Sequence, residues 1–158
     1  MPWFERIFAP LVLSSVFVWA SAAAGLAAGN PGRQPSPTPP DVTVSCPQGF
    51  SAIAHVALNK EYTKVFVLSD GTVKLAINGD AVTTVSANGK VFSFNSSGPG
   101  AIYFFVDGSI RLVEEGHLFY IGANFQGMWV YTGLVVLDSS GNIVSQSGNV
   151  TDVCAMLA

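Results

Sequence analysis

Pairs of turn-forming residues recur along this chain between β-branched and aromatic runs, and they constrain its fold more than any other feature. The clearest case is Ala101 to Glu115, where A-I-Y-F-F-V and S-I-R-L-V-E-E flank Asp107-Gly108. A type I′ turn needs positive φ at both central residues, which Asp-Gly and Asn-Gly tolerate. The same arrangement recurs at Asp70-Gly71 and Asn88-Gly89, and a looser copy spans Asp138 to Gly141. The sequence therefore predicts a succession of β-hairpins.

Turn signals also bound the remaining strands, at a spacing of about 8–12 residues that is typical of sandwiches and barrels. The predicted fold class is all-β: an antiparallel β-sandwich, jelly-roll or immunoglobulin-like, of about 10–12 short hairpin-connected strands. Phe50 to Leu58 is interpreted as a strand, with a short helix as the alternative because Ala and Leu favour helices. Glu114 to His117 is interpreted as a turn between two strands, and Asn149 to Cys154 as the last strand.

Charge is scarce in this chain. Charged residues make up 11% of the sequence, against about 25% in average proteins. Residues 30–158 hold six of the seven Lys/Arg and nine of the ten Asp/Glu, and the remaining two charged residues are Glu5 and Arg6. So neutral a surface suggests cover by partner subunits, glycans or a membrane-proximal layer; the alternative is that Ser, Thr, Asn and Gly keep it hydrated. With net charge −3 and no cluster of Lys and Arg, nucleic acid is not an expected partner.

The N-terminus resembles a targeting segment. Ile7 to Trp19 is an apolar run of signal-peptide length, and small residues follow at Ala20-Ser21-Ala22. Residues 1–28 are therefore predicted to be a secretory signal peptide. An uncleaved anchor over Ile7 to Ala28 is an alternative. The run also resembles the N-terminal helix of type IV pilins, although Glu5-Arg6-Ile7 lacks the small residue before their cleavage site. Each interpretation places the rest of the chain outside the cytoplasm, secreted or on the extracellular surface.

A proline-rich stretch, residues 29–41, separates this segment from the domain predicted over residues 42–158. Asn30 to Asp41 holds five prolines in twelve residues. Proline fixes φ and lacks a backbone donor, so an extended polyproline II arm is expected. The arm either spaces the domain from its N-terminus or reaches a neighbouring molecule.

The two cysteines, Cys46 and Cys154, bracket the domain. In an exported chain this arrangement favours a disulfide over a metal site, with pairing between molecules as the alternative. Closing a loop of this length stabilises the fold by roughly 4.7 kcal/mol in the chain-entropy model. The bond is expected to join the first strand to the last.

Catalytic motifs are not recognisable, so we expect a protein that is not an enzyme and that needs no cofactor or metal. His55 lies in an apolar run and is interpreted as a core or interface residue, and His117 as part of a solvated turn. The acids at the turns favour backbone capping. Calcium would require several oxygens to converge, here from Asn78, Asp80 and Asp138.

Two further groups of residues are candidates for modification or binding. Asn95-Ser96-Ser97 and Asn149-Val150-Thr151 match the N-glycosylation pattern, so Asn95 and Asn149 are candidate glycan sites. A cluster of aromatic residues is a candidate platform for a sugar ring, with core filling as the simpler interpretation: Phe119, Tyr120, Trp129 and Tyr131.

The first functional hypothesis is a non-catalytic secreted structural subunit that polymerises with copies of itself into a filament, pilus or surface layer. In such polymers a segment of one subunit can complete the sheet of the next. The candidate donor strand is Asp41, Val42, Thr43, Val44 and Ser45; if Cys46 bonds within its own chain, the donor must lie upstream of it. A virion surface protein shares these features.

The second hypothesis is a monomeric secreted β-sandwich module that binds carbohydrate or a cell-surface partner through the aromatic cluster and hairpin loops.

Overall fold

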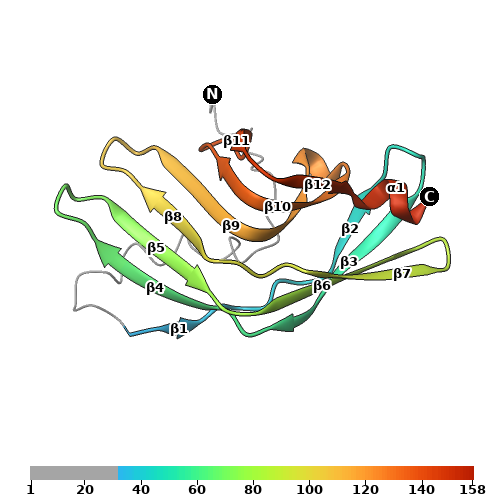
Figure 1. Cartoon of the computed structure of the whole chain (residues 1–158), viewed down its shortest axis with the longest axis horizontal. Helices are drawn as coiled ribbons and strands as arrows, with labels where there is room; N and C mark the ends of the chain where they lie inside the picture. Colours follow the sequence, from blue (N-terminus) through green and yellow to red (C-terminus); the bar gives the residue numbers. More distant parts are fainter. Residues whose placement is uncertain (1–31) are drawn as a thin grey trace, which may run out of the picture.

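The computed structural model describes residues 32–158, and this part of the chain is almost entirely β-structure (Figure 1). The prediction for residues 1–28 lies outside the described residues. The elements are β1 (Gln34–Pro35), β2 (Val42–Ser45), β3 (Ser51–Asn59), β4 (Tyr62–Val67), β5 (Val73–Asn78), β6 (Ala81–Ala87), β7 (Lys90–Asn95), β8 (Gly100–Phe104), β9 (Ile110–Ile121), the 3-10 turn η2 (Ala123–Phe125), β10 (Met128–Leu137), β11 (Ile143–Gln146), β12 (Asn149–Asp152) and α1 (Val153–Leu157).

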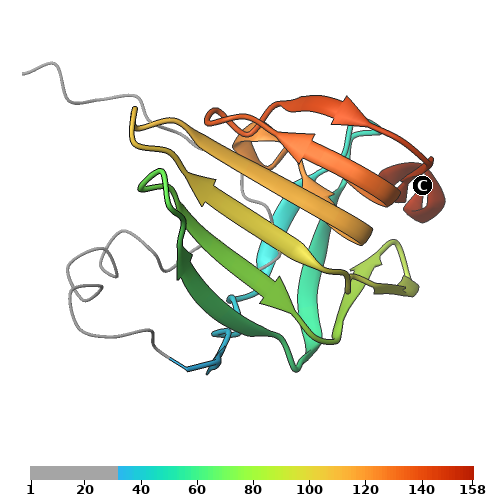
Figure 2. The same cartoon turned by 60° about the vertical axis from the view of Figure 1, so that its left-hand side comes forward.

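The strands form two antiparallel sheets, as predicted. Sheet A has the order β1-β4-β5-β8-β9-β10-β11, with β12 also paired to β10, and sheet B has the order β2-β3-β6-β7. Consecutive strands pass from one sheet to the other: β3 leads into β4, β5 into β6, and β7 into β8. The β4–β5 and β8–β9 turns lie at one end of the molecule, and the β6–β7 turn lies with α1 at the other (Figure 1). Seen from another side, the strands of sheet A lie next to one another in a strongly curved layer (Figure 2).

The hairpins form where they were predicted, but only one has the expected turn. At Asn88-Gly89, φ is 52° and 73°, so both residues are left-handed as a type I′ turn requires. At Asp70-Gly71 and Asp107-Gly108 only the glycine has positive φ. There the Asp carboxylate accepts the N–H of the residue two positions on, Thr72 or Ser109, at 2.9 Å. This capping favours a longer loop closed by a left-handed glycine over a two-residue turn.

Two apolar clusters form the core. The first lies between sheet B, the second half of β9, the first half of β10, and α1, and it includes Val44, Val85, Phe119 and Leu157. The second consists entirely of residues from sheet A, among them Leu75, Ile102, Leu112 and Val135. Successive residues of β9 reach opposite clusters, since Leu118 belongs to the second and Phe119 to the first. The strand buried on both faces is therefore β9. In the preceding hairpin arm, A-I-Y-F-F-V, the last residue is not part of strand β8: Val106 lies in the turn and is 76% exposed.

In three segments the structure either decides between two predicted elements or differs from the predicted one. Phe50 to Leu58 forms strand β3, not a helix. The expected turn at Glu114–His117 is wrong, because β9 continues through it: Gly116, with φ 108°, lies opposite Gly133, with φ 112°, and the two glycines let the strand pair bend without breaking. The last strand ends at Asp152, whose carboxylate accepts the Ala155 N–H at 2.9 Å and starts helix α1.

Candidate functional site

The residues expected to donate a strand to a neighbour lie in the sheet of their own chain. In β2, Val42 pairs with Ala54 and Val44 with Ala52 of β3, and Val44 is fully buried in the first cluster. Asp41 pairs with His55, with 2.6 Å between its Oδ1 and the imidazole Nδ1. Of the two roles expected for His55, core or interface, the core role is wrong, because His55 is exposed and contacts Asp41 of the arm. Within this chain, β2 completes sheet B.

The proline-rich arm contributes a further short strand. Gln34 and Pro35 of β1 pair with Thr63 and Tyr62 of β4, and the Ser36 N–H donates to the Glu61 carbonyl at 2.9 Å. The arm therefore covers part of the β4 edge of sheet A, where only polyproline II structure was expected.

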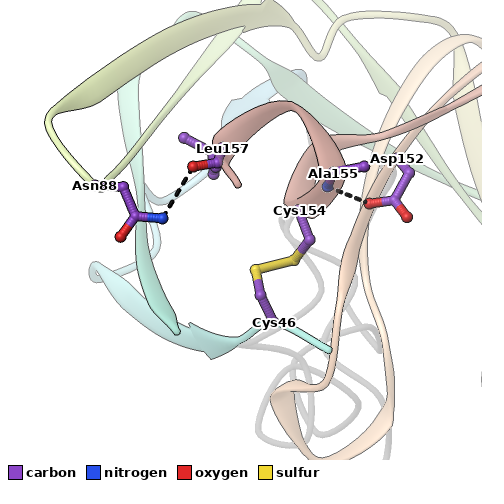
Figure 3. Close-up of a disulfide and its surroundings, with 6 residues drawn as sticks. All are labelled: Cys46, Asn88, Asp152, Cys154, Ala155 and Leu157. Atoms are coloured by element: carbon purple, nitrogen blue, oxygen red, sulfur yellow. Dashed lines mark hydrogen bonds between the residues drawn. A yellow bond between two sulfur atoms is a disulfide. The ribbon is translucent and has the colours of Figure 1, made fainter. Parts of the chain in front are cut away.

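The predicted disulfide between Cys46 and Cys154 is confirmed (Figure 3). Both cysteines are buried, with Cα atoms 5.5 Å apart, and the bond joins the end of β2 to α1. Helix α1 is also held by the β6–β7 turn, because Asn88 Nδ2 donates to the Leu157 carbonyl at 3.0 Å. Since Cys46 directly follows β2, these contacts fix β2 in its own chain.

Four edge segments have no partner strand among residues 32–158. One is β2 in sheet B, whose free side makes only the isolated bridge between Ser45 and Gln126. The other three are β11 with β12 on one side of sheet A, the Lys64–Val67 part of β4 on the other, and β7 in sheet B. Each of these three presents an exposed valine: Val144 on β11 is 58% exposed, Val67 on β4 69% and Val91 on β7 68%. Charged side chains normally protect such edges against pairing with other chains. Here β11 has none, and the one in β12, Asp152, caps α1.

The aromatic cluster is divided between the two faces of the sheet. Phe119 is fully buried in the first cluster, whereas the other three lie together on the opposite face. The Tyr120 ring lies 6.1 Å from Trp129 and 6.0 Å from Tyr131, measured between centroids. Tyr131 is only 9% exposed, and burial raises the pKa values of both tyrosines. The Tyr120 hydroxyl donates to the Gly141 carbonyl at 3.2 Å. The group packs against the second core cluster, with Tyr120 and Trp129 half-buried.

The burial of the Glu114 carboxyl group was not predicted, because Glu114–His117 was interpreted as a turn and is part of strand β9. Glu114 is 7% exposed, and burial, together with the neighbouring Glu61, raises its pKa from 4.5 to about 8. The carboxyl lies over Gly100, where a Cβ would overlap it. Its Oε1 has no hydrogen-bond partner among residues 32–158. A protonated carboxyl could act as an acid, but its enclosure leaves little access for a substrate. The period-two alternation with Leu112 was the signal that could have revealed it.

The turn aspartates are engaged as predicted, in capping. Hydrogen bonds from Thr72, Ser109 and Asn142 lower the pKa values of Asp70, Asp107 and Asp138 respectively. Asp80 lies at the corner between β5 and β6, at the other end of sheet A from Asp138. In the described range, no three His, Cys, Asp or Glu side chains lie together as a metal site would need. His117 is exposed within β9, not in a turn.

Both candidate glycan sites are exposed. Asn95 lies at the end of β7, where its Oδ1 accepts the Ser97 N–H at 2.8 Å, and Asn149 begins β12. A glycan at either position would lie beside an uncovered edge.

Among the helices of residues 32–158, none is long and apolar enough to cross a bilayer. Comparison of this chain with protein-family models, curated proteins and solved structures gave no significant match.

Proposed function

We propose that this chain is a non-catalytic, exported structural subunit that associates with copies of itself through the edges of sheet A. The observation that carries the proposal is the pair of uncovered edges at β4 and at β11–β12, which carry the exposed Val67 and Val144. Strand β11 has no charged residue, and Lys64 is the one charged residue in the open part of β4. An unpaired edge is a template for another strand. The two edges are unlike, so their pairing is head-to-tail and does not close on itself unless the rotation allows a ring.

The same proposal includes a location outside the cytoplasm. The disulfide between Cys46 and Cys154 supports a location outside the reducing cytoplasm, since such bonds persist in oxidising compartments. The apolar run from Ile7 to Trp19 supports export. A glycan at Asn95, on β7, is compatible with this proposal, whereas one at Asn149 would obstruct the β11–β12 edge.

Strand donation by Asp41–Ser45 to a neighbouring subunit is not part of this proposal. Because Cys46 holds β2 in its own chain, Asp41–Ser45 serve as the chain's own edge strand. Contact between subunits then falls to β11–β12 of one copy and the open part of β4 of the next, as β-augmentation.

The alternative, a monomeric module that binds carbohydrate through Tyr120, Trp129 and Tyr131, has less support. Tyr131 is 9% exposed, and the Tyr120 hydroxyl is already engaged.

The test is sedimentation and electron microscopy of the purified chain beside two variants. Val144→Lys places a charge on the β11 edge, whereas Val106→Lys places the same charge on an exposed turn, where the native valine is 76% exposed. We expect linear assemblies from the unmodified chain and from Val106→Lys, and monomers from Val144→Lys. Monomers in all three samples, or assemblies that persist in Val144→Lys, would contradict the proposal.

A further inference from the structure

A row of alternating aromatic and cationic residues crosses four adjacent strands on the outer face of sheet A. In register, Phe66 of β4 pairs with Lys74 of β5, Lys74 with Tyr103 of β8, and Tyr103 with Arg111 of β9. Paired residues of neighbouring strands project from the same face. We call these four residues the cation–aromatic row. Because neighbouring strands lie about 4.8 Å apart, the row is roughly 15 Å long.

Each cation of this face lies over a ring. Lys74 Nζ is 5.5 Å from the Tyr103 centroid, and Arg111 Cζ is 5.6 Å from that of Phe105. Beside the row, Lys64 Nζ lies 5.0 Å from the Phe66 centroid.

Two further ring contacts lie beside the row, one made by the arm and one at the end of β8. Arg33 Cζ lies 4.3 Å from the Tyr62 ring, and the Tyr103 and Phe105 rings stack with 6.2 Å between centroids. Four of the seven Lys and Arg residues of the chain are therefore paired with rings of sheet A: Arg33, Lys64, Lys74 and Arg111.

The surroundings leave this row accessible. Phe66 is 37% exposed and Arg111 is exposed, whereas Lys74 and Tyr103 are half-buried. The next row on the same face carries short side chains at its centre, Ala76 and Ala101. Glu115, two pairs along β9 from Arg111, is the acid on this face and bounds the cationic stretch.

We propose that the cation–aromatic row binds an acidic polysaccharide in an extended conformation. The rings offer apolar faces on which sugar rings can stack, and the lysine and arginine pair with carboxylate or sulfate groups at intervals along the polymer. The mixture of rings and separated cations suits a polymer of sugar rings that carries carboxylates better than a nucleic acid, whose recognition normally uses the kind of Lys/Arg cluster that this chain lacks. Phe66 lies in the Lys64–Val67 edge segment that the proposed association uses, whereas Lys74, Tyr103 and Arg111 lie on strands away from that edge.

The test measures binding of the purified chain to polygalacturonate and to its fully methyl-esterified, uncharged form, with single-stranded DNA and anionic lipid vesicles as further arms. Lys74→Ala and Arg111→Ala remove cations of the row, and Lys60→Ala removes a cation at the β3–β4 corner as the matched control. We expect salt-sensitive binding to polygalacturonate that each row variant weakens about threefold to tenfold, and that Lys60→Ala leaves unchanged.

Three outcomes would overturn the inference: equal binding of the charged and esterified polymers, equal loss in Lys60→Ala, or binding of DNA or vesicles but not of polygalacturonate. Absence of binding to every probe would overturn it as well. Unchanged melting temperatures of the variants show that a loss of binding is not a loss of folding.

Discussion

At the scale of single residues, Glu114 is the side chain whose environment differs most from that of an ordinary surface acid. It lies on the face of β9 that carries Leu112 and Leu118, and the absence of a side chain at Gly100 makes room for its carboxyl group. Burial disfavours the charged form, and the adjacent Glu61 disfavours it further. The folded state therefore keeps this group protonated at neutral pH.

This environment predicts how stability depends on pH. The Glu114 pKa is about 8 in the folded chain and near 4.5 in the unfolded chain, so between these values the folded state holds a proton that the unfolded state has released. Stability therefore falls as pH rises from about 4.5 to 8, by up to about 1.4 kcal/mol per pH unit. Glu114→Gln, which cannot ionise, is expected to abolish this fall in a series of denaturant titrations across that range.

Glu115→Gln is the matched control, because Glu115 is the exposed neighbour on the same strand. It should keep the pH dependence of the unmodified chain. A chain that grows more stable from pH 5 to pH 8, or the same loss of pH dependence in both variants, would refute this account of Glu114.

At the scale of elements, the corners between the sheets depend on close backbone approach. Gly79 lies between β5 and β6 with φ 144°, and a Cβ there would overlap the backbone of Lys60 and Glu61 at the β3–β4 corner. The chain passes from sheet B into sheet A at the β3–β4 corner and back into sheet B at the β5–β6 corner, so the contact between the two corners helps to set the angle between the layers.

Gly79→Ala is therefore expected to destabilise the fold by more than positive φ alone explains. The control is Gly49→Ala, because Gly49 also has positive φ, 88°, but a Cβ there would meet nothing within 4 Å. Left-handed strain costs about 1–2 kcal/mol in each variant, and the overlap adds to it only at Gly79. Equal unfolding free energies for the two variants would show that the corner has room to adjust.

Local signals account for the elements that the sequence predicted well. The hairpins at Asp70, Asn88 and Asp107 were predicted because their turn residues act within a few positions, and the disulfide because only two cysteines exist. The interpretation of Glu114–His117 as a turn failed, since a glycine opposite another glycine bends a strand that stays paired, and that partnership is not local. Helix α1 was missed because it is short and is held by Asn88 and the disulfide.

The sequence did not predict which residues of distant strands lie side by side, because strand register is not set by local signals. The cation–aromatic row depends on the register of four strands, which brings Phe66, Lys74, Tyr103 and Arg111 together from distant positions. The aromatic cluster was predicted as one group, but alternation along β9 placed Phe119 on the face opposite Tyr120.

At the scale of the whole molecule, the chain covers some edges itself and leaves others open. Strand β1 of the arm pairs with the start of β4, β2 pairs with β3, and the disulfide holds the end of β2 in place. What remains uncovered in sheet A is the rest of β4 and the β11–β12 side. Association of these unlike edges is the central claim of this account.

The most direct measurement of that claim is the mass of a mixture of two variants, each blocked at a different edge. Val144→Lys blocks β11 and Val67→Lys blocks β4, so each variant alone is expected to be monomeric. In an equimolar mixture, the intact β4 edge of the first can still pair with the intact β11 edge of the second. The account predicts a heterodimer that grows no further. A mixture that stays monomeric, or either variant forming dimers alone, would contradict it.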